Sequence, residues 1–327
     1  MANRRQFLNS LGLLVLCAGA IAQPAHKGIA ILVGVSKFDH LKITPLEGPP
    51  NDVVLMRGAL HALGYRDADV TTLVDTQPAE LHPTRNNILR VMRAAAAKLH
   101  RGDNAIIYFS GHGSQVPQNI ALMKQGYVEP DGLDEVFLTR DTRYWNRATR
   151  TVEGALLDDH IGEAISAFTR KGVQVWAIFD TCHAGDMARS PSNPEATIWR
   201  GVHGTQLAIP DEELLGTPRA DFSQAFSRHR GKAPLILFYA SKSDESTPEE
   251  YFNLPNALLG STRSNERRRF GVFTWEIANA LATTGRTFDE LVDVIRSRYD
   301  SRPFPTPGFE GPLQTPVPIR NPLGARK

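Results

Sequence analysis

Short apolar runs alternate along the chain with longer segments in which apolar residues recur at helical spacing. The runs predict five buried strands at residues 28–35, 69–75, 104–110, 173–179 and 234–241. The longer segments predict helices at residues 51–65, 84–100, 156–172, 271–283 and 288–299. Because apolar strands that alternate with helices form parallel sheets covered on both faces, the pattern predicts an α/β fold with a mostly parallel sheet.

Three stretches interrupt this alternation. Residues 187–232 and 247–270 lack a clear period and are predicted to be loops. The segment from Ser301 onward is rich in proline, which excludes a helix and predicts an extended strap or a loose tail.

The first 22 residues have the features of an export signal. Arg4 and Arg5 precede a short apolar run at 11–22, which is too short for a bilayer that needs roughly 20 apolar residues. The run ends in a small-x-small cleavage pattern, and the arginine pair resembles a twin-arginine signal. An ordinary export signal with two arginines is the alternative. We expect an exported protein, periplasmic in a bacterium or secreted, with one domain at 23–318, a tail at 319–327 and no stable membrane insertion.

Composition narrows the class of protein further. The chain is 41% apolar and 22% charged, which is typical of a globular protein. Arg4 and Arg5 account for the net charge of +2, so the rest of the chain is neutral and a nucleic-acid partner is not expected. Cys182 is the only cysteine after the signal, so it has no partner for an internal disulfide. A lone thiol in an oxidising compartment favours a functional use.

Two of the apolar strands end in reactive side chains. Residues 104–110 lead into "SGHGSQ", which contains His112, and residues 173–179 lead into "DTCHAG", which contains Cys182. The carboxyl ends of parallel strands share one edge of a sheet, so we expect the two side chains to meet there. An imidazole can take the proton of a thiol, and the thiolate can then attack a carbonyl. Gly111 and Gly113 allow a close backbone approach and leave amides free for an oxyanion.

Other interpretations of Cys182 remain open. An isolated cysteine is often an inert core residue. A metal site with His112 and His183 is a second alternative, although a closed zinc site needs four ligands and the chain after the signal has one thiol. The charged neighbours of Cys182 favour reactivity.

The two motifs resemble the histidine and cysteine motifs of metacaspases, which are caspase-like cysteine peptidases. Further matches occur in the family's order in "PLEGPPNDV", "EPDGLDEVFLTRD", "LLDDHI", "GVFTWEIANAL" and "LQTP", between residues 27 and 318. The resemblance implies a caspase-like three-layer α/β/α fold with a mostly parallel six-stranded sheet. It also implies that His112 is the general base, that Cys182 is the nucleophile, and that the amides of Gly113 and Cys182 bind the oxyanion.

Metacaspases cut after arginine or lysine, and the resemblance places their basic-side-chain pocket on Asp52, Asp180 and Ser110. Paired carboxylates suit a guanidinium or ammonium group. Pro49 stands where the family often has a cysteine, which alters one pocket wall. The alternatives are that Asp52 caps the helix predicted to start at 51 and that Ser110 bonds only to backbone.

Calcium activates many metacaspases, while catalysis itself needs no cofactor. Asp131, Asp134, Glu135 and Asp141 offer the oxygen ligands that calcium prefers. The alternative for this acidic run is a solvated loop.

Arginines in the 187–232 loop are candidate self-cleavage sites, because metacaspases are often cut between the two halves of the domain. These are Arg189, Arg200, Arg219 and Arg230. The sequence therefore predicts an exported monomeric cysteine endopeptidase that acts through an acyl-enzyme on protein or peptide substrates with basic residues. The alternatives are a non-catalytic peptide-binding protein of the same fold and a related peptidase with another preference.

Overall fold

The computed structural model describes residues 27–126, 128–129, 131–182, 198–214, 231, 233–242, 245–253, 267–283, 287–300 and 305–318. The expected export signal, the tail at 319–327, His183, Arg189, Arg219 and Arg230 lie outside the described residues.

A six-stranded sheet forms the centre of the fold, in the order β14-β11-β9-β3-β1-β2. Five strands run parallel: β1 (Gly28–Gly34), β2 (Val70–Val74), β3 (Asn104–Ser110), β9 (Gln174–Asp180) and β11 (Leu235–Tyr239). They confirm the strands predicted from the apolar runs. The sixth, β14 (Gly308–Glu310), comes from the proline-rich strap and pairs antiparallel with β11.

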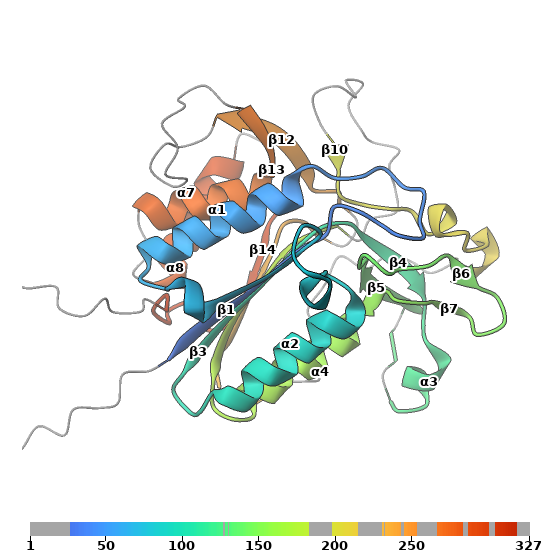
Figure 1. Ribbon diagram of the computed structural model, residues 1–327, viewed down its shortest axis with the longest axis horizontal. Coiled ribbons are helices and arrows are strands. Elements are labelled where there is room, and N and C mark those ends of the chain that lie inside the picture. Colours follow the sequence, from blue (N-terminus) through green and yellow to red (C-terminus); the bar gives the residue numbers. More distant parts are fainter. Residues whose placement is uncertain are drawn as a thin grey trace, which may run out of the picture.

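Helices cover both faces of this sheet, which confirms the expected three layers (Figure 1). One face carries α1 (Gly48–Ala62), α7 (Val272–Thr283) and α8 (Phe288–Tyr299), and the other carries α2 (Arg85–Lys98) and α4 (Asp158–Thr169). Alternate residues of β3 serve the two cores, with Tyr108 in one apolar cluster and Phe109 in the other. None of the helices in the described ranges is long and apolar enough to cross a membrane.

The start of α1 differs from the prediction. The helix begins at Gly48 rather than at 51, because Pro49 and Pro50 occupy its first turn, where no backbone donor is required. Asp52 therefore lies inside the helix and is fully buried. The interpretation of Asp52 as a helix cap is wrong.

Smaller sheets extend beyond the carboxyl edge of the central sheet (Figure 1). One contains β10 (Ile198–Trp199), β12 (Pro248–Asn253) and β13 (Arg267–Gly271). The prediction of a loop is therefore wrong over 187–232 for β10 and over 247–270 for β12 and β13. Another contains β4 (Gly113–Pro117), β5 (Leu133–Phe137) and β8 (Leu156–Leu157). The remaining short elements are β6 (Trp145–Asn146), β7 (Thr151–Val152), α3 (Ile120–Met123) and 3-10 turns at Asp67–Asp69, Ala79–Leu81, Gly204–Leu207 and Asp211–Glu213.

Candidate functional site

The ends of β3 and β9 bring His112 and Cys182 to the same edge of the sheet. Ser110 and Asp180 are register partners, and each reactive residue lies two positions beyond its strand. A Cβ atom on Gly113 would overlap the carbonyl oxygen of Cys182, so the two segments are in contact there. The shared edge expected from the sequence is therefore present.

The contacts of His112 define which nitrogen can act as a base. Its Nε2 lies 2.8 Å from the carbonyl oxygen of Thr44, and because a carbonyl only accepts, Nε2 carries the proton. Nδ1 then bears the lone pair, and it has no hydrogen-bond partner among the described residues. Burial lowers the pKa of His112 to about 4, although the backbone carbonyls of Thr44 and Arg200 act in the opposite direction. The imidazole is thus neutral at pH 7, with Nδ1 as its basic atom.

Cys182 is fully buried, yet the apolar core clusters of the described residues do not include it. Its thiol donates to the carbonyl oxygen of Glu245 at 2.6 Å, and the Ser241 hydroxyl donates to the same oxygen at 3.1 Å. Burial and a thiol hydrogen bond are compatible with a structural cysteine as well as with a reactive one. His112 Nδ1 is not a hydrogen-bond partner of the thiol in this arrangement.

Arg200 occupies the pocket that the sequence predicted for a basic side chain. Its guanidinium is fully buried, with Nη2 at 2.7 Å from Asp52 Oδ2 and Nη1 at 3.2 Å from Asp180 Oδ2. Nη1 also donates to the Ser110 hydroxyl at 3.0 Å. The structure thus brings the three predicted pocket residues together around one guanidinium. The interpretation of Ser110 as bonded only to backbone is wrong, since it also donates to Asp52 at 2.8 Å.

A third carboxylate completes this pocket, and sequence reasoning missed it. Glu249 Oε2 lies 3.3 Å from Arg200 Nη2. Both carboxylate oxygens of Glu249 also accept backbone N–H groups at the start of α1, from Glu47 at 3.0 Å and Gly48 at 3.1 Å. The only sequence signal was an acid on a segment that was predicted to be a loop.

The pocket acids are held by the backbone as well as by Arg200. Gly271 N–H donates to Asp52 Oδ1 at 2.9 Å, and Thr274 N–H donates to Asp180 Oδ2 at 3.0 Å. Burial raises the pKa of the Asp52 carboxyl, and the Arg200 charge opposes that rise. Burial would lower the pKa of Arg200, but the surrounding carboxylates hold it above its usual value. The guanidinium therefore stays charged inside the protein.

Two glycines shape the pocket walls. A Cβ on Gly48 would overlap the guanidinium of Arg200 and the carboxylate of Glu249. A Cβ on Gly271 would overlap Asp180 and the guanidinium. With a side chain at either position, the guanidinium or its carboxylate partners would have to move from the positions seen here.

The backbone of Arg200 is fixed at both its polar groups. Its N–H donates to the Thr247 carbonyl at 3.0 Å, and its carbonyl accepts from Gly113 N–H at 3.2 Å. The preceding residues pair antiparallel with β12, with Ile198 opposite Glu249. The segment 198–200 therefore lies as an added strand along the edge of β12. Arg200, a candidate self-cleavage site in the predicted 187–232 loop, is thus fully buried and held in an extended segment.

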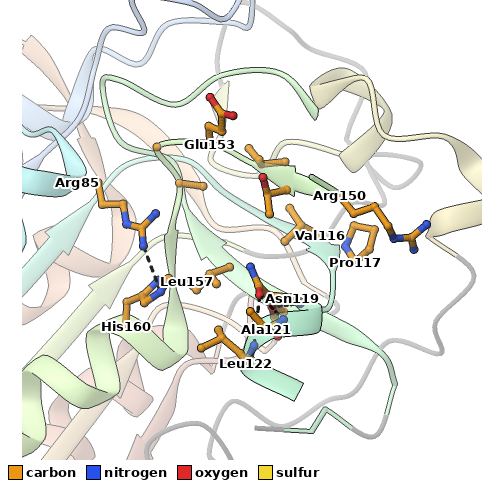
Figure 2. Close-up of a pocket in the computed structure, with 15 residues that line it drawn as sticks. Arg85, Val116, Pro117, Asn119, Ala121, Leu122, Arg150, Glu153, Leu157 and His160 are labelled. Atoms are coloured by element: carbon orange, nitrogen blue, oxygen red, sulfur yellow. Dashed lines mark hydrogen bonds between the residues drawn. The ribbon is translucent and has the colours of Figure 1, made fainter. Parts of the chain in front are cut away.

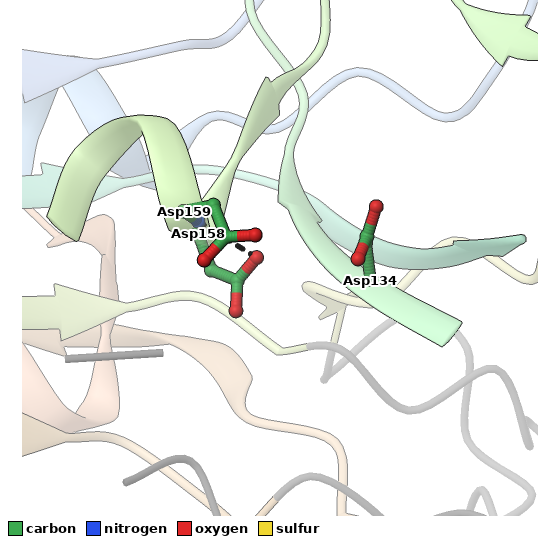
Figure 3. A group of neighbouring side chains, drawn as sticks. All are labelled: Asp134, Asp158 and Asp159. Atoms are coloured by element: carbon green, nitrogen blue, oxygen red, sulfur yellow. Dashed lines mark hydrogen bonds between the residues drawn. The ribbon is translucent and has the colours of Figure 1, made fainter. Parts of the chain in front are cut away.

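A second acidic group lies on β5 and at the start of α4 (Figure 3). Carboxylate oxygens of Asp134, Asp158 and Asp159 all lie within 4.8 Å of one another. Among the described residues, neither Asp134 nor Asp158 forms an ion pair with a cation. We call these three residues the acidic triad.

The acidic triad contains only part of the calcium ligand set expected from the sequence. Asp134 is included, but Asp131, Glu135 and Asp141 are not. Asp141 instead accepts the N–H of Arg85 at the start of α2, and Asp131 accepts the N–H of Leu133. The solvated-loop interpretation is wrong for Leu133–Phe137, which forms β5 with Asp134 buried. Asp158 and Asp159 were missed as ligands, although two adjacent acids at a predicted helix start were visible in the sequence.

The electrostatics of the acidic triad suit a divalent cation. Burial raises the pKa of Asp134 to about 7, and burial with repulsion from Glu135 and Asp159 raises that of Asp158 well above its usual value. Burial, followed by Asp131, raises the pKa of the neighbouring Glu135 to about 8. Calcium takes carboxylate oxygens at roughly 2.3 to 2.6 Å, so oxygens within 4.8 Å of one another can share one ion.

A cavity of about 310 Å³ adjoins the acidic triad and shares Asp134 with it (Figure 2). Its lining includes Asn119 and Arg150, and Arg85 with His160 on the opposite side. Arg85 Nη2 lies 3.2 Å from His160 Nε2, and burial followed by the Arg85 charge lowers the pKa of His160 to about 4. The cavity is therefore lined by fixed polar groups beside the candidate metal ligands.

Comparison with known proteins identifies relatives of the chain. A family model described as the metacaspase peptidase C14 domain matches residues 29–191. Metacaspase-1A of Aspergillus fumigatus is 32% identical over 304 residues, covering 84% of this chain and 67% of that protein. Metacaspase-1B of Aspergillus clavatus is 34% identical over 208 residues, covering 63% of this chain and 44% of that protein.

The chain is shorter than several of these relatives. It spans 45% of Metacaspase-1B of Aspergillus fumigatus, to which it is 31% identical over 208 residues that make up 63% of this chain. Among solved structures, protein GSU0716 from Geobacter sulfurreducens matches with a TM-score of 0.57 and 22% identity, over 90% of this chain and 96% of that one. That likeness supports the fold alone.

Proposed function

The chain belongs to the metacaspase family of cysteine peptidases, and we propose that it cuts peptide bonds after arginine, or after lysine, with Cys182 as nucleophile and His112 as base. One observation carries the proposal: a buried guanidinium contacts Asp52, Asp180 and Glu249 while the carbonyl of the same residue accepts from Gly113. An arginine of a substrate would be recognised by the same groups.

The proposed chemistry follows from the polar contacts at the strand ends. Nδ1 of His112 takes the proton of the Cys182 thiol, and the thiolate attacks the carbonyl carbon of the bound arginine residue. The amides of Gly113 and Cys182 stabilise the oxyanion. The leaving amine takes the proton back from His112, and water then hydrolyses the thioester. Thr44 holds the imidazole in the required tautomer throughout.

The pocket geometry favours arginine over lysine. The guanidinium presents two nitrogens to different partners, with Nη1 toward Asp180 and Nη2 toward Asp52. A lysine ammonium is a single point charge and cannot reproduce this divided contact. We therefore expect arginine to be the better substrate residue.

Peptide hydrolysis tests this proposal directly. Fluorogenic peptides ending in arginine, lysine or aspartate are assayed with the wild type, Cys182→Ala and Asp180→Asn. We expect hydrolysis after arginine, none with Cys182→Ala, and a decrease of about 100-fold in kcat/KM with Asp180→Asn because a paired pocket charge is lost. Asp103→Asn is the matched control, since Asp103 is also buried and accepts backbone N–H groups, but far from the pocket.

Two outcomes would contradict the proposal. Selective hydrolysis after aspartate would exclude the acidic pocket as the specificity site. Absence of hydrolysis of every peptide by folded wild-type protein, with and without calcium, would favour the non-catalytic binding protein.

Calcium binding at the acidic triad is a separate part of the proposed function. Asp134, Asp158 and Asp159 would hold the ion, and their like charges would be compensated by it. Because β5 pairs with β4, which starts at Gly113, an ion that orders β5 would also steady the proposed oxyanion amide. Isothermal titration with calcium tests this, and Asp158→Asn is expected to lose the binding.

A further inference from the structure

The segment 198–202 makes the backbone contacts that a bound substrate would need. Ile198 and Trp199 pair antiparallel with β12, as an extended peptide does when it adds a strand to a sheet edge. The Arg200 N–H is held by Thr247, and its carbonyl is held by Gly113. Beyond this carbonyl, Val202 N–H donates to the Gly113 carbonyl at 2.9 Å. The chain therefore passes through the site on both sides of the Arg200–Gly201 bond.

The side chain of Arg200 supplies the remaining requirement. It is fully buried and fills the space between the three pocket carboxylates. An arginine from another molecule would need the same carboxylates, the same edge of β12 and the same amide of Gly113. Two occupants cannot share these groups, so the described arrangement is closed to an external substrate.

We propose that Ile198–Arg200 is an intramolecular substrate of this site, and that cleavage of the Arg200–Gly201 bond opens the pocket. The inference rests on the proposed function, since the same thiol and the same pocket carry out both reactions. It selects one bond among the arginines of the 187–232 segment. It also accounts for the position of Gly201, which has no side chain and directly follows the arginine that contacts the three carboxylates.

The cleavage balances without any further reactant except water. The Cys182 sulfur forms a bond to the Arg200 carbonyl carbon, and His112 takes the thiol proton. The bond from that carbon to the Gly201 nitrogen breaks, and the nitrogen leaves as an amine with the proton from His112. Water then hydrolyses the thioester, which gives the Arg200 carboxylate and restores the thiol.

The closed arrangement also predicts that the first cut is slow. The thiol donates to the Glu245 carbonyl and not to His112 Nδ1, so this hydrogen bond has to break before the thiol proton can pass to the imidazole. The buried charge of Arg200 further lowers the basicity of His112 beyond the effect of burial. Hydrolysis of an external peptide should therefore show a lag, and the lag should end as the chain is cut.

The experiment follows two readouts in the full-length protein with millimolar calcium. Mass spectrometry with amino-terminal sequencing detects a fragment that begins at Gly201, while a fluorogenic arginyl peptide reports external turnover. The variants are Cys182→Ala, Arg200→Gln and Gly201→Pro. In Gly201→Pro the arginine stays in place, but the bond after it becomes a proline bond that resists cleavage. No described hydrogen bond uses the Gly201 N–H, so this change removes no backbone contact.

The expected results differ between the variants. Wild type gives the Gly201 terminus at a rate that does not depend on protein concentration, and its lag ends with that cut. Cys182→Ala stays intact. Gly201→Pro stays uncut after Arg200, with arginyl turnover about tenfold or more below that of processed wild type because the open form is rare. Arg200→Gln gives no Gly201 terminus and turns over peptide without a lag.

A matched control separates the pocket from a general loss of a buried cation. Arg269→Gln removes another buried arginine, which stacks on Tyr251 in the neighbouring strand pair. It should keep both the Gly201 terminus and the lag. Circular dichroism establishes that each variant is folded. If Arg200→Gln does not fold, Gly201→Pro alone tests whether cleavage after Arg200 is needed for turnover.

Failure of the inference and failure of the proposed function give different results. Turnover of arginyl peptide by wild type without a Gly201 terminus overturns the inference alone. Gly201→Pro with the full activity of processed wild type overturns it as well. No turnover by any folded variant, including Arg200→Gln, overturns the proposed function and the inference with it.

Discussion

Two buried groups of acids lie at the carboxyl edge of the sheet, and they differ in how their charge is balanced. Asp52, Asp180 and Glu249 surround the guanidinium of Arg200, which the chain itself supplies. In the acidic triad, Asp134 and Asp158 have no such partner among the described residues, and the pKa of each is raised by burial. In the first group the guanidinium offsets part of the negative charge as soon as the chain folds. The second group stays costly until protons or a cation offset its charge. The difference indicates that a residue of the chain, Arg200, fills the pocket, whereas the charge of the acidic triad depends on the pH and the cations of the solution.

Removal of the Arg200 charge should change the free energy of unfolding more than any other substitution considered for the two groups. Arg200→Gln in a Cys182→Ala background leaves three buried carboxylates without their partner and should lower the free energy of unfolding by about 3 to 5 kcal/mol. Urea denaturation measures the change, and the background prevents self-cleavage from affecting it. Arg269→Gln should cost less, because the described contacts of Arg269 are an exposed Glu47 carboxylate at 3.9 Å, the Tyr251 ring and the backbone carbonyl of Glu249. Equal losses in the two variants would contradict the contrast.

Addition of calcium should stabilise the triad but not the pocket. At about 100 times its dissociation constant, a ligand that binds only the folded state adds about 2.7 kcal/mol to the free energy of unfolding. We expect this gain for the wild type, and for Glu163→Gln on the same helix. Asp158→Asn should lose the gain. An equal gain in Asp158→Asn would place the ion elsewhere.

The pH dependence of stability without calcium should next test the triad, through a comparison of the wild type with Asp158→Asn. Asp52 of the pocket, whose pKa burial also raises to about 7, contributes to both proteins. The pKa values of Asp134 and Glu135 rise on folding to about 7 and about 8, so the folded chain keeps protons that the unfolded chain releases above about pH 4. The free energy of unfolding contributed by these groups is therefore present at low pH and lost as the pH rises to about 8. Asp158→Asn removes one repelling charge and should reduce the loss between pH 6.5 and 8 by about 1 to 2 kcal/mol.

Thermal denaturation at several pH values measures this change, with Glu163→Gln as the control. Comparison of variants in the same window cancels other groups. His112 and His160 act in the opposite sense, since their lowered pKa values of about 4 cost stability as the pH falls below about 6.5. A variant whose pH dependence equals that of the wild type would contradict the role of Asp158.

The third carboxylate of the pocket should show the smallest effect. Glu249→Gln keeps an oxygen for one of the two N–H groups at the start of α1, places an amide NH2 against the other, and loses one charge near Arg200. We expect a loss of about 1 kcal/mol in the free energy of unfolding, smaller than for Arg200→Gln because Asp52 and Asp180 remain. Glu250→Gln, one residue further along β12, is the control. A loss as large as that of Arg200→Gln would mean that Glu249 dominates the pocket.

The sequence predicted the parts of the fold that depend on continuous apolar runs. The strands that end before His112 and Cys182 are apolar on both faces, so their place in the sheet follows from local pattern. In contrast, β12 and β13 carry charges along their length, such as Glu249 and Arg269, and read as loop. Their stability comes from pairing across a segment far longer than a tight turn, which no local pattern reports.

The candidate site was predictable only where a motif carried it. Asp52, Ser110 and Asp180 came from the resemblance, and they do lie together. The role of Glu249 and the burial of Arg200 could not be predicted. These residues are 49 positions apart, and the sequence around each is the same whether the two form a buried ion pair or are exposed separately. Asp158 and Asp159 were visible as adjacent acids, but their approach to Asp134 depends on how α4 sits beside β5.

Gly48 and Gly271 extend this lesson to proteins that share both reactive residues. A single methyl group at either position would occupy the volume of the cation, while the histidine and cysteine motifs would remain unchanged. Such a chain would keep both motifs, but the guanidinium and its carboxylate partners would have to be displaced from the arrangement described here. Substitution of either glycine is therefore expected to reduce activity while both motifs stay unchanged, and surveys for inactive relatives should inspect these two positions first.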